Sequence, residues 1–169
     1  MDFRMADYKD IDDIMNIIFK AQENFRNNKI DQWQNNYPND DIIREDIKNK
    51  NSYVLLKDGI IIGTVYLSFD EEPTYKKIYK GQWLSNGKYA VIHRMAVDSE
   101  YKGLGLASLM MKYVEDICLN KNIHSIKVDT HSENLSMQRS LEKNGYRYCG
   151  IIYLEDGNER VAFEKLLLN

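Results

Sequence analysis

The chain has 169 residues, of which 43% are hydrophobic and 29% are charged, and its formal net charge is −3. This length and composition predict one globular domain, residues 1–169, with a core of its own. The weakly acidic balance argues against a general nucleic-acid or anionic-membrane binder. We therefore expect no nucleic-acid partner and no membrane partner, and any phosphate must be held by local structure.

The N-terminal stretch "MDFRMADYKD" carries acids where a signal peptide would have a basic region and an apolar core. No apolar run approaches the roughly 20 residues that are needed to span a bilayer. The two cysteines, Cys118 and Cys149, lack the spacing of metal ligands. These features predict a cytoplasmic protein with reduced thiols.

The first half of the chain predicts a short strand, two helices and a hairpin. Residues 3–6 read as the strand, and a short second helix follows Pro38, with Asn39 as its N-cap. Asp58–Gly59, between two β-rich runs, is a strong hairpin signal. Apolar residues at helical spacing define the first helix: Ile11, Ile14, Met15, Ile18, Phe19 and Phe25.

The second half alternates strands and helices. Residues 70–88 show no clean period and read as a loop, Tyr89 to Val97 as a strand, and residues from about 104 to 120 as a helix. "HSIKVDT" predicts a strand, "LSMQRSLEKN" a helix stopped by Gly145, and Asp156–Gly157 a closing hairpin. The order predicts a mixed α/β domain with hairpins at both ends and helical crossovers in the middle.

The segment "VDSEYKGLGLAS" places bare backbone at the start of a helix. Gly103 and Gly105 permit a positive φ and a close approach of a ligand to the main chain. A helix start adds unpaired N–H groups, here from Leu104 to Ser108, and the positive end of the helix dipole. Together they suit a pyrophosphate without a basic side chain.

Three other structures also place glycines before a helix. A glycine-containing loop with no ligand would look the same in isolation. A Walker P-loop is excluded because no Gly-Lys-Ser/Thr follows. A dinucleotide fold is a weaker match, because Ser108 stands where the third Gly or Ala is expected and no repeated βαβ units follow.

The same residues resemble the GNAT (Gcn5-related) N-acetyltransferase family. Its central motif is Gln/Arg-x-x-Gly-x-Gly/Ala after a strand ending in x-Ala-Val. Here "RMAV" ends at Val97, and "KGLGLA" runs from Lys102 to Ala107. Lys102 replaces the family's Gln or Arg, yet a lysine still reaches a phosphate as a point charge. A second element, "NLSMQRSLEKNGY" from Asn134 to Tyr146, resembles N-x-x-A…Y-E-K-x-G-F.

The resemblance covers essentially the whole chain and implies an α/β (α+β) fold. The fold would have a mixed, largely antiparallel sheet with a central splayed strand pair, flanked by about four helices. It further implies an N-acetyltransferase that transfers the acetyl group of acetyl-CoA to a primary amine of a small molecule or peptide. The cofactor-binding residues that it implies are Met95, Ala96, Val97, Lys102, Gly103, Leu104, Gly105, Leu106, Ala107, Ser108 and Asn134. Asn134 also reads as a helix N-cap.

Amide formation from a thioester needs an acceptor for the amine proton. Asp129, on the strand before Asn134, stands where some family members carry an acidic base, and is otherwise a solvated strand residue or a partner for a lysine. His93 is the second candidate because imidazole titrates near neutrality. His131 is a weaker candidate, and His124 is expected at the surface. No spacing of histidines or acids suggests a metal.

The clearest departure from the family is Leu141, at the place of the tyrosine that protonates the leaving thiolate. This difference supports an alternative function, a CoA- or acyl-CoA-binding module with little or no turnover. A thiolate whose conjugate acid has a pKa near 8.5 still leaves without full protonation. The substitution therefore does not exclude catalysis.

The acceptor amine is the least specified part of the prediction. Aromatic residues in the segments that wall the family's acceptor cleft are candidates for substrate contact, namely Trp33, Tyr37, Trp83 and Tyr89. Core aromatics would have the same pattern. Glu71 and Glu72 would attract a cationic acceptor. Exposed edges of the terminal hairpins suggest a homodimer.

Overall fold

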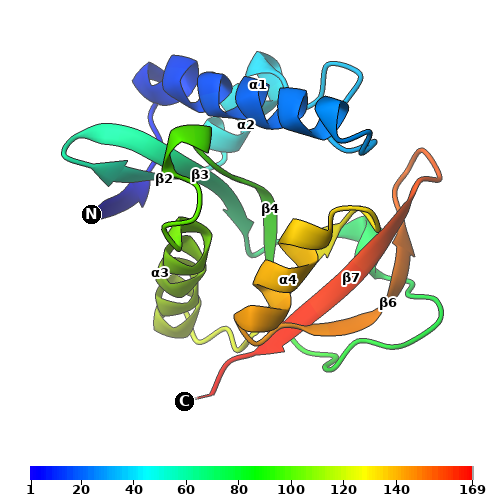
Figure 1. The fold of residues 1–169 in the computed structure, drawn as a ribbon. Helices are drawn as coiled ribbons and strands as arrows, with labels where there is room; N and C mark the ends of the chain where they lie inside the picture. Colours follow the sequence, from blue (N-terminus) through cyan, green and yellow to red (C-terminus); the bar gives the residue numbers. More distant parts are fainter. Residues whose placement is uncertain (169) are drawn as a thin grey trace. The chain divides into compact units, whose positions relative to one another are not determined.

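The computed structural model describes residues 1–168, which fall into two compact units (Figure 1). The first unit contains Met1–Leu67 and Arg94–Tyr113, and the second contains Ser68–His93 and the chain from Val114 onward. The strand β4, Ala90–Val97, and the helix α3, Leu106–Asn120, are divided between the two units, and the last residue of β3 also belongs to the second.

The order of elements confirms the order predicted from the sequence. The elements that lie mainly in the first unit are β1 (Asp2–Met5), α1 (Ile11–Asn27), α2 (Asp40–Lys48), β2 (Ser52–Lys57) and β3 (Ile60–Ser68). Those in the second unit are β5 (Ser125–Thr130), α4 (Leu135–Lys143), β6 (Arg147–Tyr153) and β7 (Glu159–Leu166). Short 3₁₀ turns cover Tyr8–Asp10, Pro73–Tyr75 and Ser99–Tyr101.

The strands form a mixed sheet in the order β1-β2-β3-β4-β5-β7-β6. The pairs β1–β2, β2–β3, β5–β7 and β6–β7 are antiparallel, whereas β4 and β5 are parallel. The β4–β5 ladder joins only Ala90–Ile92 to Ile126–Val128, although β4 continues to Val97. This short ladder agrees with the central splayed pair that the resemblance predicted, and the α/β fold class is confirmed.

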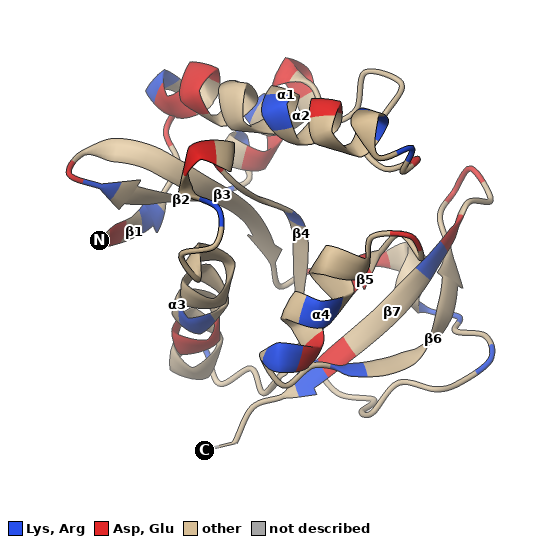
Figure 2. Ribbon diagram, in the orientation of Figure 1, with Lys and Arg blue, Asp and Glu red and all other residues tan. Residues whose placement is uncertain are grey.

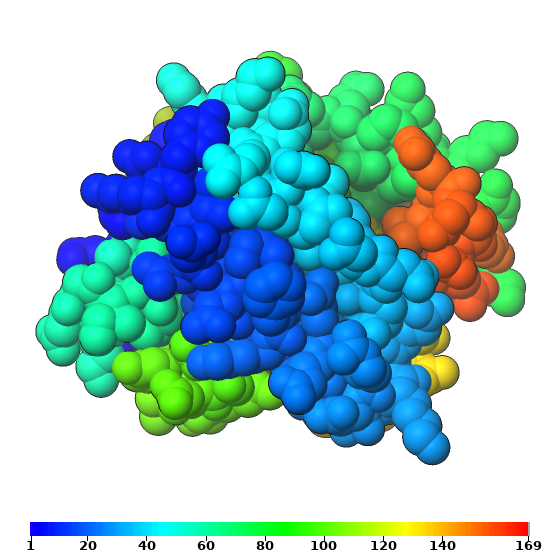
Figure 3. Space-filling view, turned by 90° about the horizontal axis from the view of Figure 1, so that it is seen from above, coloured from blue at the N-terminus to red at the C-terminus, as the bar shows by residue number. Residues whose placement is uncertain are grey.

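The core of the first unit forms because α1 presents one apolar face. Ile11, Ile14 and Ile18, at helical spacing, are at most 2% exposed and pack with residues of α2, β2 and β3. Asn39 begins α2 as predicted, since its side chain accepts a hydrogen bond from the backbone N–H of Ile42 at 3.0 Å. Figure 3 shows α1, the 28–39 segment and α2 side by side on one face of this unit.

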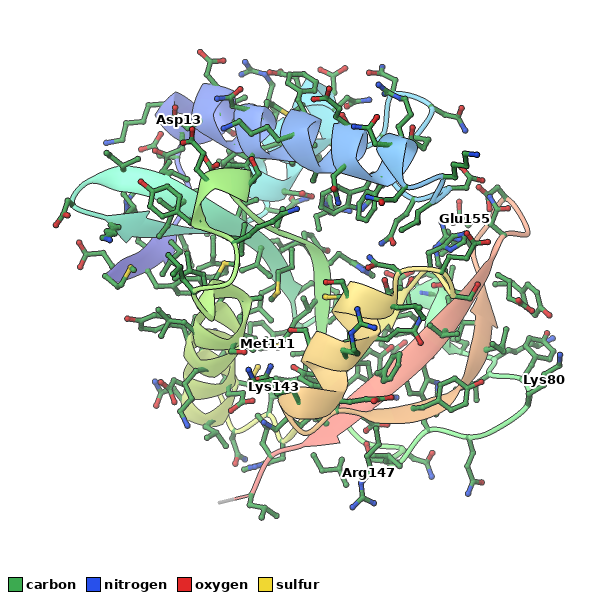
Figure 4. The ribbon with its side chains drawn as sticks, in the orientation of Figure 1. Asp13, Lys80, Met111, Lys143, Arg147 and Glu155 are labelled. Atoms are coloured by element: carbon green, nitrogen blue, oxygen red, sulfur yellow. The ribbon has the colours of Figure 1, made fainter. Side chains whose placement is uncertain are left out.

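The segment 70–88, predicted as a loop, is more ordered than its sequence indicated. It contains the 3₁₀ turn Pro73–Tyr75 and an antiparallel bridge between Tyr79 and Ile151. Tyr75 is 2% exposed in a cluster with Val91, Ile152 and Ala162. The structure of this segment depends on single long-range contacts, which leave no periodic pattern in the sequence. Figure 4 shows Lys80 on the outer turn of the segment, where its side chain is exposed.

Within residues 1–168, none of the helices combines the length and the apolar character that a membrane crossing requires.

Candidate active site

The glycine turn, Lys102–Ser108, has the backbone that the sequence predicted. Gly103 and Gly105 have φ values of 79° and 74°, in the left-handed region that favours glycine. A Cβ built on either glycine would meet no protein atom within 4 Å. The backbone conformation, and not tight packing, therefore requires glycine at both positions, and the space above them is open to a ligand.

The start of helix α3 adds groups that can bind an anion at this turn. Helix α3 begins at Leu106, and the N–H of Leu109 donates to the carbonyl of Gly105 at 3.0 Å. The N–H groups in the first turn of a helix have no acceptor within the helix. Residues with a left-handed backbone before the helix orient these N–H groups toward one concave face. The first turn of α3 carries no acidic residue, and Figure 2 shows it uncharged. The geometry fits a pyrophosphate.

Four contacts hold the glycine turn and the segment that leads to it. Leu106 is 6% exposed and anchors the start of α3 in the core. Asp98, just after β4, donates its backbone N–H to the carbonyl of Ile62 at 2.8 Å. The Asp98 carboxylate accepts a hydrogen bond from the backbone N–H of Glu100 and lies 3.3 Å from Lys20 Nζ on α1. These contacts order the polar gap between strand and glycine turn.

The second unit contains a polar cluster formed by Glu72, Tyr75, His93 and Asp129. His93 Nε2 lies 3.4 Å from Glu72 Oε2, and His93 Nδ1 lies 4.0 Å from Asp129 Oδ2. The Tyr75 hydroxyl donates to Asp129 Oδ2 at 2.6 Å. The side chains of His93, Glu72 and Asp129 are 22%, 27% and 10% exposed. An imidazole in such a polar cluster is a candidate general base.

Two groups in the polar cluster have shifted pKa values. The pKa of the Glu72 carboxyl lies below its ordinary value, chiefly because His93 hydrogen-bonds to it, with a smaller contribution from Thr74. Burial raises the pKa of the Tyr75 hydroxyl well above its ordinary value, and the charge of Asp129 raises it further. Glu72 is therefore an anion at neutral pH, while Tyr75 keeps its proton and remains a hydrogen-bond donor.

The remaining candidate residues have local partners. Asn134 is the N-cap of α4, because its side-chain oxygen accepts from the backbone N–H of Met137 at 3.1 Å. His131 Nδ1 accepts from the backbone N–H of Glu133 at 3.0 Å, and His124 Nε2 lies 2.9 Å from Asn122 Oδ1. The capping role of Asn134 is thus shown, and its contact with a cofactor stays a prediction.

The aromatic candidates for substrate contact all pack against their own units. Trp33 packs on the first core and edge-on to Phe25, and the Tyr37 hydroxyl accepts from Arg94 Nη1 at 2.7 Å. Trp83 Nε1 donates to the carbonyl of Tyr75, and the Tyr89 hydroxyl accepts from the backbone N–H of Glu72. Lys127 Nζ lies over the rings of Trp83 and Tyr89, 4.4 and 4.1 Å from the centroids. Substrate contact for these four residues stays a prediction.

Leu141 is fully buried, with no exposed surface. A tyrosine at this position would have to replace a packed core side chain of the second unit. Residues 1–168 bring together no group of three or more His, Cys, Asp or Glu side chains that could hold a metal ion.

The fold and the glycine turn define an acetyltransferase, and the comparison of sequences agrees. Residues 12–146 match the acetyltransferase (GNAT) family, so the chain belongs to this family. The predicted family is confirmed.

Individual relatives show the same class of protein. The chain is 32% identical to a GNAT-family acetyltransferase of Streptococcus agalactiae 2603, whose crystal structure superposes with a TM-score of 0.90 over 99% of this chain and 96% of that one. For a putative acetyltransferase of Staphylococcus aureus Mu50 the TM-score is 0.74 and the identity 27%, over 98% and 99% of the chains. The S-alkylcysteine N-acetyltransferase of Bacillus subtilis (strain 168) is 27% identical over 114 residues, which are 68% of this chain and 58% of that protein.

The sequence indicated His93 and Asp129 separately, and the structure brings them together. His93 and Asp129 directly follow the Ile92–Val128 pair of the parallel ladder. The alternation of side chains along each strand was the sequence signal that could have placed the two residues on the same face of the sheet. Sequence reasoning assigned Glu72 only to the attraction of a cationic acceptor. The contacts of Glu72 and Tyr75 within the polar cluster carried no sequence signal, because the 3₁₀ turn that positions them was not predicted.

Proposed function

We propose that this chain is an acetyl-CoA-dependent N-acetyltransferase that acts on a primary amine by direct attack of the amine on the thioester. Family membership supports the class of reaction. The observation that carries the proposal is the glycine turn, whose two left-handed glycines precede the uncharged start of α3. The residues present fit the pyrophosphate of CoA, with the exposed Lys102 at the start of the turn as a further positive charge.

Acetyl-CoA supplies a thioester, whose carbonyl carbon forms the new C–N bond while its C–S bond breaks. Main-chain N–H groups at Met95 and Ala96 are proposed donors to the carbonyl oxygen as it gains charge. His93 is the proposed acceptor of the amine proton, either directly or through a water. The Glu72 and Asp129 carboxylates, 3.4 and 4.0 Å from the imidazole nitrogens, stabilise the imidazolium that forms.

The thiolate that leaves takes its proton from solvent in this proposal. The usual tyrosine is replaced by Leu141, which is fully buried. A thiol with a pKa near 8.5 is a good enough leaving group for this step to proceed without a dedicated acid.

The acceptor class follows from the polar cluster and the relatives. Two carboxylates and a histidine favour an amine that arrives as a cation. It loses one proton to water to become the attacking neutral amine, and passes its second proton to His93 as the amide forms. The relative from Bacillus subtilis is named for S-alkylcysteine, so small amino-acid amines of this kind belong among the first acceptors to test. A cytoplasmic location and a homodimer stay predictions.

The second candidate function is a CoA-binding module without turnover, which the buried Leu141 favours. One assay separates the two functions. The protein is incubated with acetyl-CoA and a panel of amines that includes S-alkylcysteines, peptide N-termini and polyamines, and free thiol is measured. Thiol release that depends on the amine supports the enzyme. Thermal stabilisation by CoA without thiol release supports the binding module, and stabilisation by NADH but not by CoA contradicts both.

A further inference from the structure

Arg94 has an unusual backbone for a residue inside a strand. It lies in β4, Ala90–Val97, with a φ of 48°, in the left-handed region that residues other than glycine rarely adopt. An L-residue in this conformation costs free energy and persists only where surrounding contacts determine it. The next residue along the strand is Met95, the start of the segment that we propose contacts the acetyl group.

The Arg94 side chain is fixed by three elements of the first unit. Its Nε and Nη2 donate to the two oxygens of Asp46 on α2, at 2.8 and 2.7 Å. Its Nη1 donates to the hydroxyl of Tyr37 at 2.7 Å, and its Cζ lies 4.5 Å from the centroid of the Tyr66 ring on β3. The Arg94 and Asp46 side chains are 13% and 9% exposed, so their ion pair is shielded from solvent, whereas Tyr37 is 41% exposed.

We propose that Arg94 is a positioning residue, whose clamp by Asp46, Tyr37 and Tyr66 holds its left-handed backbone conformation in β4 and so sets the direction of the main-chain N–H groups of Met95 and Ala96. The expected effect on rate rests on the proposed function, but the backbone geometry at Arg94 can be tested without assuming that function.

The alternative is that the ion pair only ties α2 to the sheet. The first unit offers a matched control for that role, the Arg4–Asp10 pair. Arg4 Nη1 and Nη2 donate to the Asp10 oxygens at 2.7 and 3.1 Å, and Asp10 is 4% exposed. This pair is a bidentate arginine–aspartate ion pair like that of Arg94 and Asp46, with a more exposed arginine, 39% against 13%. Arg4 has an ordinary strand backbone in β1.

The test compares Arg94→Ala with Arg94→Gly. Both remove the clamp, but glycine adopts a positive φ without cost and alanine does not. We expect Arg94→Ala to lower kcat about tenfold, with KM for acetyl-CoA within about twofold of wild type, and Arg94→Gly to recover most of the loss.

Asp46→Ala should lower kcat in the wild-type background and have no further effect in Arg94→Gly. Asp10→Ala should lower the melting temperature without changing kcat.

Equal kcat values for Arg94→Ala and Arg94→Gly, or equal effects of Asp46→Ala and Asp10→Ala on kcat, would overturn the positioning role. If Asp46→Ala does not fold, Asp46→Asn provides the same comparison. A second readout needs no substrate: the amide ¹H–¹⁵N signals of Met95 and Ala96 should shift in Asp46→Asn and stay in place in Asp10→Asn. Unmoved signals in Asp46→Asn contradict the clamp, whereas absence of acetyl transfer in wild type contradicts only the proposed function.

Discussion

The two units offer different kinds of chemistry. In the first unit the candidate groups are main-chain N–H groups, presented by Gly103, Gly105 and the start of α3. In the second unit they are side chains, with His93 between Glu72 and Asp129. A backbone site tolerates changes of side chain as long as φ is kept, whereas a side-chain cluster depends on the identity of each member. Binding and chemistry should therefore respond to different substitutions.

The largest effect should come from Gly105→Glu. Position 105 requires a positive φ, which glutamate rarely adopts. The new side chain also places a negative charge where the pyrophosphate is proposed to bind. We expect the Kd for CoA, measured by titration calorimetry, to rise by about 100-fold or more. Gly59→Glu is the matched control, because Gly59 also has a positive φ and open surroundings in the same unit. An unchanged Kd in folded Gly105→Glu would remove the turn from the binding site.

Leu141→Tyr tests whether the second unit has room for the acid that the family often uses. The position is fully buried, so the larger side chain should lower the free energy of unfolding by about 1–3 kcal/mol without raising kcat. Leu141→Met, which conserves the volume, should cost less than about 1.5 kcal/mol in urea unfolding. A Leu141→Tyr protein of normal stability and higher kcat would show that this position faces the reaction.

Asp129→Asn should lower kcat about tenfold and leave the Kd for CoA unchanged. The amide oxygen still accepts from the Tyr75 hydroxyl, but it carries no charge to stabilise a protonated His93. Tyr75→Phe is the complementary variant, since it removes the hydroxyl and keeps the charge, and its kcat should stay closer to wild type. Wild-type kcat in Asp129→Asn would leave Asp129 with the single role of anchoring Tyr75.

The smallest effect should be the pH dependence that Glu72 adds to stability. Its pKa is lowered in the folded protein, so its contact with His93 contributes fully above the ordinary glutamate pKa of about 4.3 and is lost as the pH falls through the lower folded value. Between about pH 5 and 3 the melting temperature of wild type should fall by about 1–3 °C more than that of Glu72→Gln. Glu71→Gln, at the exposed neighbour, should follow wild type. Parallel curves for all three proteins would contradict the contact.

The range over which a sequence signal acts explains what the sequence could predict. The glycine turn was predictable because its signals are local: two glycines, a strand before them and the apolar period of α3 after them. The helices and hairpins followed for the same reason, since Asn39 and Asp58–Gly59 act within a few residues. His93 and Asp129 were predicted as candidates, but only the fold shows that they are neighbours of Glu72 and Tyr75.

Residues with long-range partners were the ones that sequence reasoning missed. Arg94 is separated by 48 residues from Asp46 and by 57 from Tyr37, and no motif links them. The 70–88 segment is ordered by single contacts such as the bridge from Tyr79 to Ile151, which leave no periodic pattern. Leu141 was recognised as a departure from the family, yet only the structure shows that it is packed in the core.

The most direct test of the account is kcat and CoA affinity measured side by side for His93→Gln. If His93 accepts the amine proton in the second unit while CoA is held by the backbone of the first, kcat should fall by about 100-fold and the Kd for CoA should stay within about twofold of wild type. His124→Gln, at a histidine whose side chain pairs with the nearby Asn122, should change neither value. Wild-type kcat in His93→Gln, or a joint loss of kcat and CoA binding in a folded protein, would contradict the separation of binding and chemistry.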